Sequence, residues 1–335
     1  MSLPQLIKKV PGATTAFRTL TGADKPGAWL FQPKTHRWLA QDELREQLPK
    51  IYQLLANYYL IQKRLPGPAL GGRFAFSLAN SLAHFQGITA IPLKVNDLKI
   101  YLNLDDPRML QVPNELEEIS GEGSFLRRYL QEGDTFLDIG SNHGSFSVAA
   151  ASFLGPTGKI YAFEPQPQLN RLVQESLRAN EAPDFQVFAL ACSDREGEAQ
   201  FFVPRSSSGQ AGLHFRFSAA AAHETITVRL TRLDDLISNH LITGQPFIKL
   251  DVEGNELAVL KGAKQFLTTY KPSIYIEINP RAMAAANTTT TQLFNLLTEI
   301  GFNGYSIPED VQKKILPLEN LKGDRHQNVI LRFET

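Results

Sequence analysis

The sequence of 335 residues predicts an α/β protein with a mostly parallel sheet that carries helices on both faces. Two observations lead to this fold class. From Gly133 onward, apolar runs of strand length alternate with stretches of helical periodicity. The first such run, Thr135–Ile139, leads into a glycine-containing turn and then a helix-forming stretch, as in nucleotide-binding βαβ units.

Seven strands are expected in this sheet, with helices between them. The strands are Thr135–Ile139, Lys159–Phe163, Phe185–Leu190, Phe247–Leu250, Ser273–Ile278, Gly304–Ile307 and Asn328–Arg332. The helices are Ser145–Phe153, Pro167–Asn180, Arg232–Asn239, Glu256–Leu267 and Thr289–Ile300.

An irregular insert from Gly197 to Val228 separates the third and fourth strands. Its flanks, Glu198–Val203 and Thr225–Arg229, have strand character, while its centre is rich in Gly, Ser and Ala. We interpret residues 205–224 either as a lid over the site or as an ordinary surface loop.

For residues 1–90 the sequence predicts a smaller, mainly helical appendage of unknown role. Helical periodicity occurs at Gln41–Arg64 and Phe74–Phe85. Residues 91–335 form the main domain, in which a hairpin at 91–102 precedes the core from about residue 133.

The composition of the chain argues against several classes of protein and site. Lys+Arg and Asp+Glu both number 34, so no overall charge favours a nucleic-acid partner. No apolar run reaches the roughly 18 residues of an integral membrane segment, and the N-terminus lacks a secretory signal pattern. Cys192 is the single cysteine, which excludes an intrachain disulfide and fits a cytoplasmic location. Since the histidines lack a ligand spacing, we expect no metal site.

The turn after the first strand predicts the cofactor. Its residues are spaced as Asp138-x-Gly140-x-Asn142-x-Gly144, and not as the G-x-G-x-x-G that wraps a pyrophosphate. A turn that admits a ligand closely without cradling two phosphates points to S-adenosylmethionine (SAM), whose carboxylate would meet the next helix N-terminus. The alternative is that the glycines only allow close strand–helix packing.

Acids after the second and third strands complete the predicted cofactor site. Glu164 is placed to accept two hydrogen bonds from a ribose diol, although alone it could be a surface residue. Ser193 and Asp194 could accept from the adenine amino group, or Asp194 could simply open a turn. Cys192 is expected to be a small buried hydrophobe.

A polar cluster follows the fourth strand, where a methyl donor and an acceptor hydroxyl would meet. Asp251 and Glu253 can orient or deprotonate the acceptor, and Lys249 should point the same way as Asp251. Glu256 is explained as a first-turn helix acid. Glu277 is either a partner of Lys249 or an acceptor-site group, and His143 is a further candidate base.

Several motifs in order resemble the FkbM-type methyltransferase family over about residues 90–335. The matching segments are Gly133–Ser147, Ile160–Pro165 with Asn180, Ala189–Asp194 with Gly197, Thr231–Leu236 and Phe247–Glu256. The resemblance implies a Rossmann-like class I methyltransferase fold and O-methylation of hydroxyls on sugars, glycans or secondary metabolites. Two positions depart from the family pattern: Ser141 replaces the usual Ala, and His143 replaces a small or apolar residue.

The sequence therefore predicts a SAM-dependent O-methyltransferase. The expected cofactor-binding residues are Asp138, Gly140, Ser141, Asn142, Gly144, Glu164, Ser193 and Asp194. The expected catalytic residues are Asp251, Glu253 and His143. The alternatives are an NAD-dependent oxidoreductase and a non-catalytic SAM-binding scaffold, while the acceptor, the general base and the oligomeric state stay open.

Overall fold

The computed structural model describes residues 29–32, 37–40, 90–205, 207–214, 223–236 and 244–333. The chain divides into two compact units, Met1–Lys94 with Tyr101–Asp105, and Val95–Ile100 with Asp106–Thr335. In the first unit, β1 (Trp29–Gln32) pairs antiparallel with β2 (Arg37–Ala40). The two helices expected at 41–64 and 74–85 lie outside the described residues, and the boundary near residue 90 stays a prediction.

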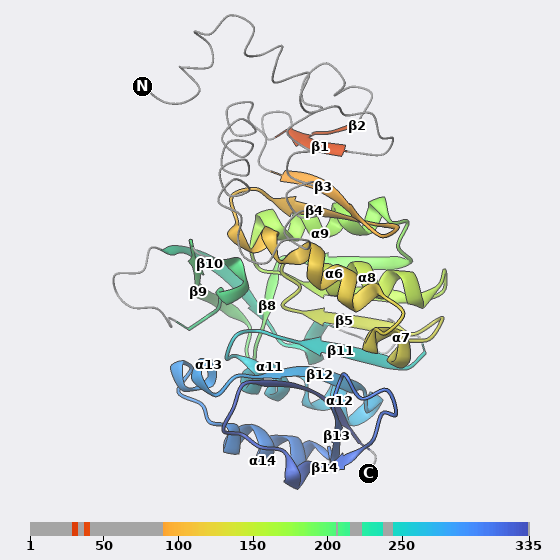
Figure 1. Ribbon diagram of the computed structural model, residues 1–335. Coiled ribbons are helices and arrows are strands. Elements are labelled where there is room, and N and C mark those ends of the chain that lie inside the picture. The colour runs from red at the N-terminus through yellow and green to blue at the C-terminus, as the bar shows by residue number, and fades with distance from the viewer. Residues whose placement is uncertain are drawn as a thin grey trace, which may run out of the picture. The chain divides into compact units, whose positions relative to one another are not determined.

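A mixed sheet of eight strands forms the centre of the second unit, in the order β14-β13-β15-β12-β11-β5-β6-β7 (Figure 1). The strands are β5 (Thr135–Ile139), β6 (Lys159–Phe163), β7 (Asp184–Phe188), β11 (Pro246–Leu250), β12 (Ser273–Ile278), β13 (Gly304–Ser306), β14 (Leu316–Pro317) and β15 (Gln327–Arg332). The strands from β7 to β12 are parallel, and β15 pairs antiparallel with β12 and β13. The predicted fold class is confirmed, and the short edge strand β14 is an addition to the seven expected strands.

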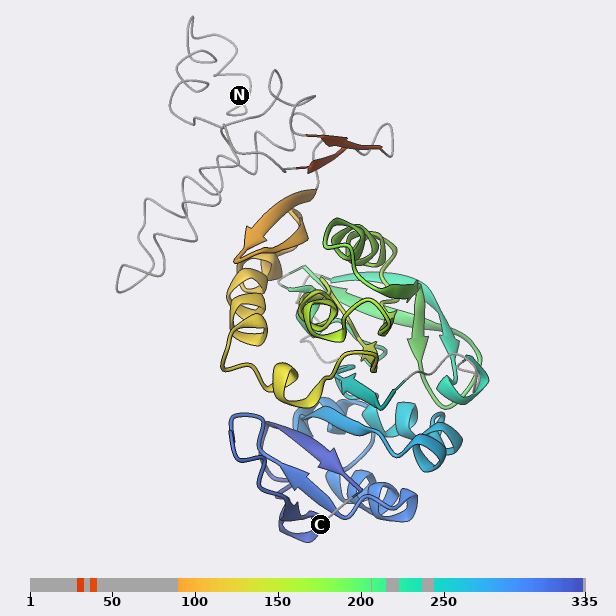
Figure 2. The ribbon, with the colours of Figure 1, turned by 90° about the vertical axis from the view of Figure 1, so that its right-hand side faces the viewer.

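Helices cover both faces of this sheet (Figures 1 and 2). Alternate residues of β5 point to opposite faces of the sheet and contact the helices on those faces. Leu137 and Ile139 face a buried cluster that includes apolar side chains of α11, α12 and α14. Asp138 points the other way, toward α8, where Ser147 donates a hydrogen bond to it. The helices are α8 (Ser145–Leu154), α9 (Pro167–Ala179), α11 (Glu256–Lys261), α12 (Lys264–Tyr270) and α14 (Thr290–Ile300).

The helix expected at Glu256–Leu267 is in fact two helices, α11 and α12, which break at Gly262. A Cβ atom at Gly262 would lie 2.0 Å from the carbonyl oxygen of Ser193. The break therefore lets the chain approach the backbone of Ser193 closely, at one of the predicted cofactor positions.

The third expected strand, Phe185–Leu190, is also divided. Its first part is β7, while Leu190 begins β8 (Leu190–Cys192), which joins a separate sheet in the order β8-β10-β9. The other two strands are the flanks of the insert, β9 (Gly197–Pro204) and β10 (His223–Thr231), which are strands as expected and pair antiparallel with each other. Because β10 offers β8 a parallel partner, the chain leaves the main sheet at Ala189.

The remaining elements are the lead-in to β5 and short connections between the strands. They are β3 (Ala90–Val95), β4 (Leu98–Asn103), η1 (Pro107–Leu110), α6 (Val112–Ser120), α7 (Phe125–Tyr129), η2 (Ser208–Gln210), α10 (Leu233–Leu236), α13 (Pro280–Ala285) and η3 (Leu318–Asn320). β3 and β4 form the expected hairpin, with Asn96 at φ 54° in its turn. Of the helix expected at Arg232–Asn239, the part beyond residue 236 is not described. Among the described residues, none of the helices has the length and apolarity needed to cross a membrane. The cytoplasmic location stays a prediction.

Candidate active site

A pocket with about 750 Å³ of space, partly open to solvent, lies at the carboxyl ends of β5, β6, β8 and β11. Seven of the predicted site residues line it, namely Gly140, Ser141, Asn142, His143, Glu164, Asp251 and Glu253. Four do not, namely Asp138, Gly144, Ser193 and Asp194.

The glycines of the turn after β5 have packing roles that the structure shows directly. Gly140 has φ 82°, and a Cβ atom there would lie 2.0 Å from the carbonyl oxygen of Asp251. Gly144 has φ 81°, and its Cβ would lie 3.0 Å from the side chain of Val173 on α9. Close packing therefore explains both glycines. It also brings the end of β5 against the end of β11, so the turn and Asp251 share one pocket.

Glu164 at the end of β6 is buried at the edge of this pocket, with 3% of its surface exposed. Its carboxylate accepts hydrogen bonds from the backbone N–H groups of Asn142 at 2.8 Å and Gln166 at 2.9 Å. Asn142 adopts φ 51°, the left-handed conformation that Asn tolerates. Burial raises the pKa of Glu164 to about 7.

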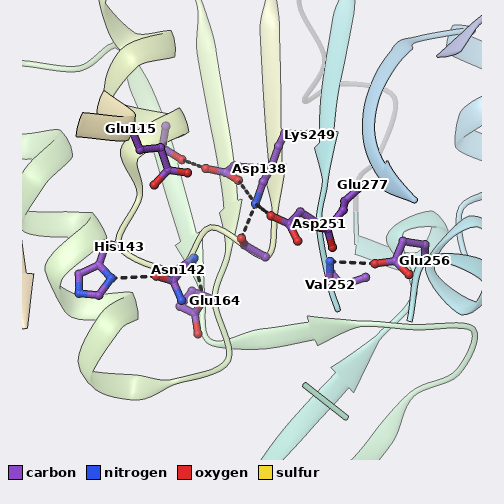
Figure 3. A network of polar contacts seen from close by, with 12 residues as sticks. Glu115, Asp138, Asn142, His143, Glu164, Lys249, Asp251, Val252, Glu256 and Glu277 are labelled. Carbon is purple, nitrogen blue, oxygen red and sulfur yellow. Dashed lines mark hydrogen bonds and ion pairs between the residues drawn. The ribbon is translucent and has the colours of Figure 1, made fainter. Parts of the chain in front are cut away.

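Lys249 connects β5 to the acidic end of β11 (Figure 3). Its Nζ donates to the carbonyl oxygen of Gly140 at 2.5 Å and lies 3.5 Å from Asp138 and 3.6 Å from Asp251. Burial alone would lower the pKa of Lys249, but the carboxylates of Asp251 and Asp138 raise it. The prediction that Lys249 and Asp251 point the same way is confirmed. Asp138 is fully buried behind Lys249, where it also accepts from Ser147, so it holds Lys249 and does not face the pocket.

Three carboxylates gather at the end of β11 and β12. Oxygen atoms of Asp251, Glu253 and Glu277 all lie within 4.8 Å of one another. Oε1 of Glu277 lies 2.7 Å from Nε2 of His326. Burial raises the pKa of Glu277 to about 7. Glu277 thus belongs to the acidic cluster rather than pairing with Lys249. Such a cluster could also hold a cation, so the prediction of a site without metal stays untested.

Ser193 and Asp194, which were predicted to contact the adenine ring, follow two residues that line the pocket. Ala191 and Cys192 line the pocket, and the carbonyl oxygen of Cys192 accepts from Asn255 at 3.0 Å. Burial raises the pKa of the Cys192 thiol, which fits the predicted small buried hydrophobe. Ser193 is buried, while the side chain of Asp194 is 39% exposed and lies 3.8 Å from Arg195. Their roles at an adenine ring stay predictions.

His143 lies within the turn with only 1% of its surface exposed. Its Nδ1 is 2.8 Å from Oδ1 of Asn142, and its Nε2 is 3.7 Å from Oδ2 of Asp106. Burial lowers the pKa of His143 to about 4, so the ring is neutral near pH 7. Both ring nitrogens therefore face groups of the protein itself.

Sequence reasoning missed two residues that line the pocket, Arg108 of η1 and Glu115 of α6, which form an ion pair at 3.2 Å. Neither residue follows a strand of the main sheet, so the rule that ligands bind beyond strand ends gave no signal for them. Ser208, Ala211 and Leu213 of the insert line the pocket as well. They belong to the segment 205–224, for which the sequence left open a lid or an ordinary surface loop.

The strand order and the pocket at the carboxyl ends of the parallel strands define a Rossmann-like protein of the class I methyltransferase type. Residues 138–303 match the family model described as the Methyltransferase FkbM domain. Residues 138–303 therefore form a domain of the FkbM methyltransferase family. The predicted family is confirmed over this range, and the match supports the prediction of SAM as the cofactor.

Three curated relatives match at low identity. The hexuronic acid methyltransferase AglP of Haloferax volcanii is 28% identical over 151 residues, which are 44% of this chain and 58% of that protein. The 2-O-methyltransferase NoeI of Sinorhizobium fredii is 28% identical over 174 residues, 48% of this chain and 70% of that protein. The AMB antimetabolite synthetase AmbE of Pseudomonas aeruginosa is 26% identical over 207 residues, 52% of this chain but 10% of that protein. The chain thus spans only a small part of AmbE and just over half of AglP.

Among solved structures, a methyltransferase FkbM from Methylobacillus flagellatus KT aligns with a TM-score of 0.39 and 15% identity. The alignment covers 67% of this chain and 53% of that chain.

Proposed function

We propose that the protein transfers a methyl group from SAM to a hydroxyl of a sugar, glycan or secondary-metabolite acceptor. One observation carries this proposal: the buried carboxylate of Glu164 and the acidic end of β11 open into the same pocket, on either side of Gly140. The first is suited to a nucleoside ribose, and the second to an acceptor hydroxyl.

The residues present fit the proposed cofactor. Ser141 is 5% exposed, and its Oγ has no hydrogen-bond partner among the described residues, although it lines the pocket. Glu164 has lone pairs beyond the two backbone N–H bonds that it accepts, and a ribose diol would supply two donors. Buried polar groups without enough partners are costly, so both side chains support a polar ligand at this place.

We assign the cofactor site to the turn after β5 and to Glu164. Ser193 and Asp194 are assigned to the adenine end of the cofactor, farther from the pocket. Gly140, Ser141 and Asn142 would contact the cofactor, while Gly144 and Asp138 keep the turn in place from behind. When bound, SAM supplies an electrophilic methyl group on a sulfonium. The protein's own part is to hold the acceptor oxygen in contact with it.

Asp251 and Glu253 are the residues that we propose to act on the acceptor. Either carboxylate can accept the hydroxyl proton as the new C–O bond forms, and both offset positive charge at the reacting centre. Lys249 fixes Asp251 through the ion pair at 3.6 Å. We place His143 in the cofactor turn rather than at the acceptor, because its nitrogens face Asn142 and Asp106.

The names of two relatives support a sugar-like acceptor. AglP is named a hexuronic acid methyltransferase and NoeI a 2-O-methyltransferase, and each matches a little under half of this chain. At 28% identity, these names support the class of acceptor and not its identity.

An acceptor screen tests this function. Formation of S-adenosylhomocysteine (SAH) from SAM would be measured by mass spectrometry with hexoses, hexuronates and their methyl glycosides. We expect methylation of at least one hydroxyl, and a large fall in kcat for Asp251→Asn with little change in SAM affinity. SAM binding without methylation of any acceptor would favour the scaffold alternative, and reduction of NAD would favour the oxidoreductase.

A further inference from the structure

One wall of the pocket comes from the insert between β9 and β10. Ser208, Gly209, Ala211 and Leu213 of this wall segment, defined as residues 207–213, all line the pocket. Backbone hydrogen bonds in both directions between Phe202 and Gly212, at 2.9 and 3.1 Å, attach its far end to β9. Its near end depends on side chains from elsewhere in the chain.

Asp106, which precedes η1, holds that near end. Its Oδ1 accepts from the backbone N–H groups of both Arg108 and Ser208, each at 3.0 Å. Asp106 is only 6% exposed. Gly209 lies directly against the Arg108 side chain, because a Cβ atom there would be 2.6 Å from Arg108 Cδ. The wall segment is therefore seated on η1 through a buried carboxylate and a close glycine contact.

Asn142 connects this seat to the cofactor turn. Its Nδ2 donates to Ser208 Oγ at 2.9 Å, and its Oδ1 accepts from Arg108 Nε at 3.2 Å. The backbone N–H of the same residue donates to Glu164 at 2.8 Å. Asn142 thus hydrogen-bonds both to the seat of the wall segment and to the carboxylate assigned to the ribose. Figure 3 shows Asn142 beside Glu164.

The second oxygen of Asp106 has a different environment. Asp106 Oδ2 is buried without a hydrogen-bond partner among the described residues, 3.7 Å from Nε2 of His143. Since Nδ1 of the neutral ring faces the acceptor Oδ1 of Asn142, Nδ1 carries the proton and Nε2 is an acceptor. The two acceptor atoms His143 Nε2 and Asp106 Oδ2 then face one another. An amide nitrogen in place of Oδ2 would turn toward Nε2 as a donor.

We propose that Asp106 and Ser208 are positioning residues for the cofactor: they seat the wall segment on Asn142, and this seating is required for tight SAM binding. Asp106 lies outside residues 138–303 of the family match. The inference rests on the proposed function only in taking this pocket as the SAM site. If the seated arrangement is the form that binds, loosening the seat lowers its population and weakens apparent affinity in proportion.

Calorimetric titration of the full chain with SAH, together with thermal unfolding of each variant, tests the proposal. Ser208→Ala removes the hydroxyl between the wall segment and Asn142, and we expect SAH to bind roughly three- to tenfold more weakly. Ser207→Ala is the matched control, because among the described residues its Oγ accepts only from Gly209, within the same turn. We expect its affinity to stay within about twofold of wild type.

Two substitutions of Asp106 distinguish an effect on the position of the wall segment from an effect on the stability of the whole protein. Asp106→Ala removes the acceptor for both backbone N–H groups and should weaken SAH binding more than Ser208→Ala does. Asp106→Asn keeps that acceptor and adds a donor toward His143, so its affinity should stay within about threefold of wild type. A merely structural role would lower the unfolding temperature of Asp106→Ala and leave its affinity unchanged.

Equal affinities for wild type, Ser208→Ala and Asp106→Ala would overturn the proposal, as would equal losses for Ser207→Ala and Ser208→Ala. Should Asp106→Ala fail to fold, the Ser207/Ser208 pair and Asp106→Asn decide the question. A loss of SAH affinity in Asp106→Asn as large as that in Asp106→Ala would also contradict the proposal. Wild-type protein that binds no SAH would instead refute the proposed function, and the inference with it.

Discussion

Glu256 provides a stability test of the electrostatics beneath the acidic end of β11. It is fully buried, and its Oε1 accepts from the backbone N–H groups of Val252 at 3.2 Å and Gly254 at 3.1 Å. Its Oε2 has no hydrogen-bond partner among the described residues. The sequence explained Glu256 as a helix acid, and it does begin α11, but it also organises the turn after β11.

Burial raises the pKa of Glu256 from 4.5 to about 7. A carboxyl group with a raised pKa binds its proton more tightly in the folded state, so stability is lost as pH rises from about 4.5 through 7. A shift of this size costs on the order of 3 kcal/mol above pH 7. Glu256→Gln keeps the Oε1 acceptor and removes the charge, so it should abolish this loss.

The assay is urea unfolding followed by far-ultraviolet circular dichroism at pH 5 and pH 8. Trp29 and Trp38 are the two tryptophans, and both belong to the first unit, so their fluorescence would not report on this site. We expect the free energy of unfolding of Glu256→Gln, relative to wild type, to rise by about 2–3 kcal/mol from pH 5 to pH 8. Any constant cost of the buried amide cancels in this difference.

The control is Glu299→Gln, whose side chain is 66% exposed beside Lys264. Its relative stability should change by less than about 0.5 kcal/mol over the same pH interval. A relative stability of Glu256→Gln that is the same at both pH values would refute the account of this buried carboxylate.

Three further predictions concern the pocket. Gly140→Ala should destabilise the protein far more than Gly197→Ala, because both have positive φ but only Gly140 has a backbone oxygen 2.0 Å from the new Cβ; thermal unfolding and SAH titration would measure this. Lys249→Met leaves Asp138 buried without its cation and should lower the free energy of unfolding by about 3–5 kcal/mol in urea unfolding. SAH affinity should rise as pH increases through about 7, since only the ionised Glu164 offers both oxygens to a diol; calorimetry that finds no change between pH 6 and 8 would contradict this.

The features that could be predicted from the sequence are those encoded within one strand and the turn that follows it. β5, β6 and β12 have the predicted bounds, because each is a short apolar run between turn residues. Glu164 and Asp251 lie where they were expected, since both directly follow such strands and carboxyl ends of parallel strands meet at one edge.

The rest of the site depends on contacts between distant segments. Asp106 and Ser208 are 102 positions apart, and their hydrogen bond exists only because the insert folds back onto η1. Glu277 and His326 are 49 positions apart and meet because β15 lies antiparallel to β12. No local spacing encodes either pair, so neither could be found without the fold.

The most direct test of the central claim is calorimetric titration with SAM, SAH and NAD, on wild type and on Glu164→Ala. Glu196→Ala, at an exposed position just before β9, is the matched control. We predict that wild type and the control bind SAM and SAH but not NAD, and that Glu164→Ala loses this binding. Absence of SAM and SAH binding to wild type, or undiminished binding by Glu164→Ala, would contradict the assignment of this pocket.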